Sequence, residues 1–131
     1  MNGTSKTERQ PGCKVIVFRR SGAVIQFGLV PRDDGLGFPI MAFPDPYGID
    51  RALIGFALET LGLHDPKVHE RFVARPHEQG WLFYLLEERP VAGAAAPEVT
   101  WRELHRARDD VNQEERKALV KAIQYLRDPP T

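Results

Sequence analysis

One segment constrains the fold of this 131-residue chain more than any other, the run from Gly37 to Leu63. It reads GFPIMAFPDPYGIDRALIGFALETLGL, a proline-rich loop followed by a short apolar stretch that keeps helical spacing and stops at a glycine. The Asp50 carboxylate can accept hydrogen bonds from the free amides of a first helical turn, so we expect Asp50 to be the N-cap. Gly62 can adopt the left-handed conformation that commonly ends a helix. The segment therefore predicts a helix over residues 50–61 that is apolar on nearly every side.

The residues around this segment have the patterns of strands. In Lys14–Phe18 β-branched residues dominate and both faces are apolar, which predicts a central strand. A second strand over Val24–Val30 would form a hairpin with it and end at Pro31, which has no N–H for a ladder. Val68–Arg75 and the aromatic run Trp81–Leu86 are typical of a second hairpin.

The last third of the chain predicts a short strand and two helical segments. Glu98–Trp101 has the pattern of a strand or turn, and Arg102–Arg108 that of a helical turn. Asn112 can cap the last helix, with Glu115 at the reciprocal capping-box position. The apolar stripe of that helix comprises Leu119, Ala122, Ile123 and Leu126. A helix between strands and another at the end indicate an α+β fold, a mixed sheet with helices on both faces.

Composition narrows the classes of function. The 18 Lys and Arg residues balance 18 Asp and Glu residues, so nothing favours a nucleic acid or a membrane surface as partner. Cys13 is the only cysteine and starts an apolar run, which predicts a buried, unreactive thiol and excludes a cysteine-based zinc site. Residues 1–12 are polar and lack a signal-peptide core. We expect a cytoplasmic protein with tails at 1–12 and 129–131 and a single domain over 13–128.

The loop and helix of residues 37–63 resemble the loop-helix-loop of the Nudix hydrolase family. Phe38-Pro39 stand where family members have an aromatic residue or Leu and then Pro before two glycines, and Gly62-Leu63 close the family's conserved box. Strands before the box and a strand, a Trp turn and a terminal helix after it follow in the family order. The resemblance covers roughly residues 13–127 and implies an α/β/α sandwich.

The residues that carry catalysis in the family's box are replaced in this sequence. Ile40 and Met41 stand for the two glycines, and Tyr47 stands for the early glutamate. Gly55 and Phe56 replace the Arg-Glu pair of the helix. Glu59 keeps the first glutamate of the final pair, and Thr60 replaces the second.

This replacement has a chemical consequence. Hydrolysis of a nucleoside diphosphate needs divalent cations to screen the pyrophosphate and to activate water. Mg²⁺ takes hard oxygen ligands, which the family gathers on one helical face as carboxylates. Positions 56, 59 and 60 are here Phe, Glu and Thr, so one carboxylate remains where three are required. We therefore expect no metal cofactor.

Candidates for a ligand pocket and their structural alternatives both follow from the sequence. The pocket candidates are Arg32, Met41, Tyr47, Phe56, Glu59 and Glu87. The resemblance places Arg32 near the substrate cleft, but a surface arginine paired with Asp33 or Asp34 fits as well. Glu87 or the adjacent Glu88 could join Glu59 in a relocated site, or form a solvated strand end. The four histidines lack the spacing of metal ligands, so we expect ordinary surface or loop residues at His64, His69, His77 and His105.

The sequence favours a Nudix-like domain that has lost its metal-binding glutamates and is a binding or interaction module for a nucleotide-related ligand. One alternative is a divergent hydrolase that uses Mg²⁺ or Mn²⁺ with Glu59 and a relocated carboxylate. Another is a homodimer or protein-interaction scaffold that docks through the apolar helix 50–61. Collapse of Phe56, Tyr47 and Met41 into the former cleft is also open.

Overall fold

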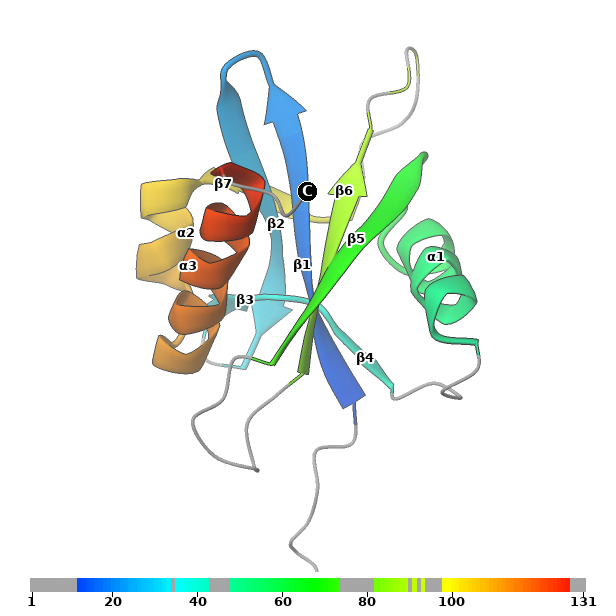
Figure 1. The fold of residues 1–131 in the computed structure, drawn as a ribbon, viewed down its shortest axis with the longest axis horizontal. Coiled ribbons are helices and arrows are strands. Elements are labelled where there is room, and N and C mark those ends of the chain that lie inside the picture. The colour runs from blue at the N-terminus through cyan, green and yellow to red at the C-terminus, as the bar shows by residue number, and fades with distance from the viewer. Residues whose placement is uncertain are drawn as a thin grey trace, which may run out of the picture.

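The computed structural model describes residues 12–33, 35–42, 48–73, 82–89, 91, 93 and 98–127. Along these residues four strands, a helix, three strands and two helices follow one another, in the predicted order except for two short strands over 35–37 and 40–42 that were not predicted (Figure 1). The elements are β1 (Gly12–Ser21), β2 (Val24–Arg32), β3 (Gly35–Gly37), β4 (Ile40–Ala42), α1 (Ile49–Glu59), β5 (Pro66–Val73), β6 (Leu82–Glu88), β7 (Thr100–Glu103), α2 (Leu104–Asp110) and α3 (Gln113–Arg127).

The described strands form a mixed sheet with the order β3-β2-β1-β6-β5, in which β4 also pairs with β1 and β7 with β2. β1 and β6 are parallel, and the other pairs are antiparallel. Both predicted hairpins are confirmed, β1 with β2 and β5 with β6. β1 lies in the middle because both of its faces are apolar and each can pack against a helical layer.

Helix α1 covers one face of the sheet, and α2 and α3 cover the other (Figure 1). Successive residues of β1 point to opposite faces, so Cys13, Val15 and Val17 join the core cluster beneath α1. Ile16 and Phe18 join the cluster beneath α2 and α3. The predicted α+β fold with helices on both faces is thus confirmed.

The start of α1 differs from the prediction, whereas its end agrees. Gly48 is the N-cap and makes no side-chain capping bond, so the assignment of Asp50 to that role is wrong. Asp50 lies in the first turn instead, where a negative charge still favours the helix dipole. Gly62 has a φ of 71°, which confirms the left-handed residue after the helix.

The start of α3 confirms one half of the predicted capping box. The Glu115 amide donates to Asn112 Oδ1 at 2.9 Å. The reciprocal role of Glu115 is wrong, because its carboxylate contacts Lys14 and Arg32 on the sheet. Leu119 and Ala122 of α3 are fully buried, as the apolar stripe of this helix predicts.

Several boundaries shift. β2 continues through Pro31, which pairs with Leu36 of β3 beyond the end of the β1 pairing. A proline is tolerated there because alternate residues of an antiparallel strand direct the N–H away from a single partner. The predicted helical turn over Arg102–Arg108 begins two residues later, as helix α2, because Arg102 belongs to β7. Trp81 and the end of the predicted 68–75 strand lie outside the described residues. Among the residues that are described, no helix is long and apolar enough to cross a membrane.

Candidate functional site

The box positions on the α1 side are occupied by packing side chains. Met41 is 6% exposed and belongs to the core cluster beneath α1. Phe56 is partly buried against the same cluster, while Glu59 is exposed at the end of the helix. Tyr47 lies outside the described residues. For Met41 and Phe56, the structure agrees with the collapse of apolar side chains onto the core.

Glu88 fixes the turn that follows α1. Its carboxylate is 6% exposed and accepts hydrogen bonds from the backbone amides of His64, at 3.1 and 3.2 Å, and of Asp65, at 3.2 Å. Arg89 donates to the Asp65 carboxylate at 2.8 Å and closes the turn from outside. The interpretation of Glu88 as a solvated strand end is wrong, because its carboxylate is buried and accepts from backbone amides of the turn.

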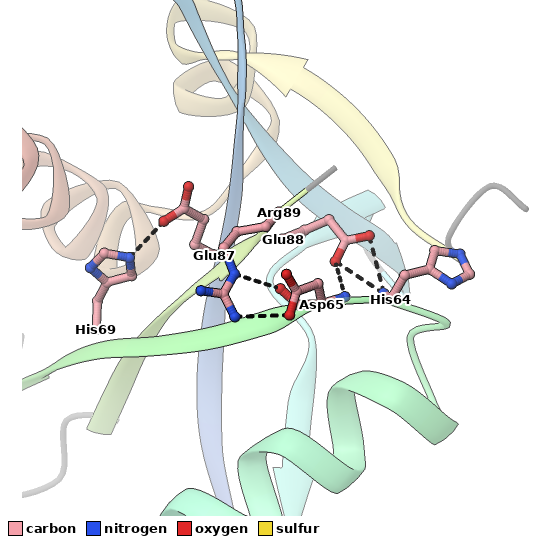
Figure 2. A network of polar contacts seen from close by, with 6 residues as sticks. All are labelled: His64, Asp65, His69, Glu87, Glu88 and Arg89. Carbon is pink, nitrogen blue, oxygen red and sulfur yellow. Dashed lines mark hydrogen bonds and ion pairs between the residues drawn. The ribbon is translucent and has the colours of Figure 1, made fainter. Parts of the chain in front are cut away.

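The Glu87 side chain is directed to the face of the sheet opposite to that of Glu88 (Figure 2). Its Oε1 lies 2.8 Å from His69 Nε2, and its Oε2 lies 3.5 Å from Arg20 Nε. The His69 ring packs between Phe18 and Tyr125 of α3, at centroid distances of 5.3 and 6.1 Å. Glu87 is therefore not a solvated end, and His69 is a packed residue of β5 and not a surface one. Adjacent residues of a strand face opposite sides, so Glu87 and Glu88 do not converge.

An arginine completes the polar groups on the α1 face. The Arg19 guanidinium stacks over Trp101 at 4.3 Å, and its Nε donates to Gln26 at 2.7 Å. Burial lowers the pKa of Arg19, and the charge of Glu88 acts in the opposite direction. These contacts hold Arg19 in one orientation beside the core cluster.

The remaining candidate ligands are dispersed. Cys13 is fully buried, and burial raises the pKa of its thiol to about 11, which confirms the prediction of an unreactive thiol. His64 and His105 are exposed as predicted, and His77 lies outside the described residues. Within the described part of the chain, no group of three or more His, Cys, Asp or Glu side chains could hold a metal ion.

Arg32 belongs to a buried charge network on the α3 face. Lys14 Nζ lies 2.6 Å from Glu115 Oε2, and the two side chains are 2% and 1% exposed. Arg32 Nη1 lies 2.9 Å from the same oxygen and donates to the Phe38 carbonyl, also at 2.9 Å. Among the described residues the carboxylate partner of Arg32 is Glu115, which is distant in sequence, so the alternative pairing with Asp33 is wrong. Asp34 itself lies outside the described residues.

Arg32 also lines a pocket of about 170 Å³ between the β2–β3 turn and the junction of α2 with α3. The other lining residues are Leu36, Asp110, Val111, Asn112 and Glu115. Drug-sized ligands fill pockets of roughly 300–1,000 Å³, so this pocket suits a single ring system. Asp110 is held by Arg102, whose Nε lies 3.2 Å from its Oδ2.

The pocket unites one predicted residue with several that sequence reasoning missed. Arg32 was identified as a pocket candidate, whereas Met41, Phe56 and Glu59 lie on the α1 side and Glu87 lies beside His69.

A charged Lys14 inside an otherwise apolar strand was a signal of a buried partner, because lysine is almost never fully buried unless paired. Its partner, Glu115, is 101 residues away in sequence, and only the packing of α3 on β1 joins them.

Comparisons with known proteins reveal structural relatives only. No known family model matches the sequence, and no curated protein matches it. A Nudix hydrolase from M. smegmatis, RenU, superposes with a TM-score of 0.68 at 12% identity over 98% of this chain and 93% of that one. The Nudix domain of Shewanella oneidensis NrtR, crystallised with ADP ribose, gives 0.59 at 14% identity over 95% and 94%. A C. elegans Ap4A hydrolase gives 0.62 at 13% over 88% and 96%. The likeness lies in structure, and it shows that this chain has a Nudix-like fold.

Proposed function

We propose that this protein is a Nudix-fold binding module that holds a nucleotide-related ligand without cleaving it. The observation that carries the proposal is the polar pocket at Arg32, combined with apolar packing where the family gathers its metal ligands. The protein thus offers a pocket for the ligand on the α3 side and apolar packing on the α1 side, where the family holds its metal.

The α1 side supports the loss of cleavage. Mg²⁺ needs several oxygen ligands in near-octahedral geometry. Phe56 packs against the core where the family has a glutamate, and Glu59 alone offers a free carboxylate on that turn. Glu88 is engaged by backbone amides and Glu87 by His69 on the other face, so relocating them would break existing contacts. Removing Glu88 from the turn would take the charged acceptor away from these backbone amides.

The α3 side supports the retention of a ligand. The Arg32 guanidinium is held by Glu115 and the Phe38 carbonyl, so it is ordered before any ligand arrives. Such preorganisation reduces the entropy lost on binding. Leu36 and Val111 supply apolar walls, and the NrtR domain with ADP ribose shows that this fold accommodates a nucleotide sugar.

Binding and cleavage are tested separately with the purified protein. We expect ADP-ribose, UDP-glucose or GDP-mannose to give a saturable heat of binding in calorimetry, with no product released in the presence of Mg²⁺ or Mn²⁺. The metals alone should leave the melting temperature unchanged, because a ligand stabilises only a protein with a site for it. Steady release of product, or a rise in melting temperature with metal, would instead establish the divergent hydrolase.

Variants locate the binding site. Arg32→Gln should abolish binding of the nucleotide sugar, since it removes the guanidinium from the pocket. Arg51→Gln is the matched control, because Arg51 is exposed on α1. Circular dichroism melting establishes that both variants are folded. Unchanged binding by a folded Arg32→Gln protein would show that the ligand lies elsewhere.

A further inference from the structure

The pocket at Arg32 has an excess of hydrogen-bond donors over acceptors, and this excess bears on the chemistry of the ligand. An inference about that ligand rests on the proposed function, because the pocket is the same. Three polar lining residues have donor or acceptor groups outside the hydrogen bonds seen among the described residues: Arg32, Asn112 and Asp110.

Arg32 and Asn112 contribute donors. Arg32 Nη1 makes both hydrogen bonds to Glu115 and the Phe38 carbonyl, and the N–H groups of Nε and Nη2 take no part in them. Asn112 Oδ1 accepts from the Glu115 amide, which settles the orientation of the side-chain amide. Its Nδ2 therefore carries the two N–H donors that the helix cap does not use.

Asp110 contributes the acceptor. Its Oδ2 accepts from Arg102 Nε at 3.2 Å, and its Oδ1 takes no part in that bond. A carboxylate is an acceptor only, and guanidinium is a donor only. Glu115, the other acidic lining residue, directs its Oε2 to Lys14 and Arg32. Because Glu115 is only 1% exposed, the more accessible acceptor oxygen is that of Asp110, and the pocket offers it together with donors from Arg32 and Asn112.

We propose that the pocket recognises a flat heterocycle that presents a carbonyl oxygen beside a ring N–H. A carbonyl oxygen has two lone pairs and can accept from Arg32 and Asn112 together, whereas a ring nitrogen accepts one hydrogen bond. The adjacent N–H donates to Asp110. An amino group in place of the carbonyl would set donor against donor at the guanidinium. Leu36 and Val111 contact the faces of the ring.

Matched nucleotide pairs test this chemistry, since one member has a carbonyl beside a ring N–H where the other has an amino group beside an unprotonated ring nitrogen. We expect inosine monophosphate to bind at least tenfold more tightly than adenosine monophosphate in calorimetry, a difference of about 1.4 kcal/mol. Uridine monophosphate should exceed cytidine monophosphate in the same sense. Equal or tighter binding of the amino-bearing nucleotides would overturn the inference and leave the proposed function standing. Failure of all four nucleotides and of the nucleotide sugars would overturn both.

A substitution at the acceptor links the preference to the pocket. Asp110→Asn replaces the carboxylate with an amide of the same shape, so the preference for inosine over adenosine should fall to less than threefold. Asp109→Asn is the control, because Asp109 is its exposed neighbour outside the pocket lining and should keep the full preference. Melting curves of both variants confirm folding. A folded Asp110→Asn protein with an undiminished preference would refute the role of Asp110.

Discussion

The buried Lys14–Glu115 pair permits a stability prediction that can be worked out from the structure. Glu115→Gln removes the carboxylate that Lys14 contacts at 2.6 Å, with both side chains at most 2% exposed. Lys14 Nζ then lies near the Phe83 ring, 6.0 Å from its centroid, without that negative charge. Breaking a buried ion pair by removing one partner costs about 3–5 kcal/mol, because the remaining charge stays desolvated.

The two ends of the pair should respond differently. Lys14→Met leaves Glu115 with Arg32, whose Nη1 lies 2.9 Å from the same oxygen, so we expect a loss of at most ~1 kcal/mol. The double variant Lys14→Met/Glu115→Gln should recover most of the loss of Glu115→Gln, since the buried ammonium group that lost this carboxylate is removed as well. The expected coupling free energy is about 2–3 kcal/mol, at the upper end for contacting residues.

Urea unfolding of the wild type, both single variants and the double variant measures this coupling. A slope of about 1–3 kcal/mol per molar urea converts a loss of 3 kcal/mol into a midpoint lower by at least ~1 M. Arg127→Gln, at the exposed end of α3, serves as a control for the loss of a surface charge. A coupling below about 0.5 kcal/mol would refute the reasoning, because the two groups would then be energetically independent.

Three further predictions concern the core and the end of α1. Gly62→Ala should cost roughly 1–2 kcal/mol in urea unfolding, because Gly62 has a φ of 71°. Gly55→Ala should instead stabilise the protein by roughly 0.5–1 kcal/mol, since an added Cβ in helix α1 meets nothing within 4 Å. Burial raises the pKa of the Cys13 thiol from 9.0 to about 11. About 3 kcal/mol of stability that is present below pH 9 should therefore be lost as the pH rises through 11. An identical alkaline decline in the Cys13→Ala variant would contradict this cause. Glu88→Gln should cost about 1–3 kcal/mol, measured by melting, because a charged acceptor leaves the amides of the turn after α1.

The site illustrates what pattern reasoning can and cannot reach. Asn112 was predicted correctly as the cap of α3, because a cap depends on residues a few positions apart. Its neighbour Glu115 was assigned to the same local box, but its carboxylate contacts Lys14 and Arg32 instead. A buried lysine and an arginine offer Glu115 charge-assisted contacts that a backbone amide cannot match.

Glu87 and Glu88 show a second limit. Their place after an apolar strand suggested a solvated end, yet both carboxylates are mostly buried, on opposite faces of the sheet. The alternation of a strand predicts that their side chains diverge. What each one meets depends on how β5 and the turn after α1 pack against β6, which no local pattern encodes.

The amino-acid sequence by itself determined the order of the helices and of the strands other than β3 and β4, the central place of β1 and the glycine that ends α1, since these follow from local spacing and backbone preference. It also determined that positions 56, 59 and 60 hold a single carboxylate, that of Glu59. Only the tertiary structure decided that Arg32, Asp110 and Asn112 line one pocket and that Lys14 pairs with Glu115. Those contacts join residues far apart in the chain, and their partners are selected by the packing of α2 and α3 on the sheet.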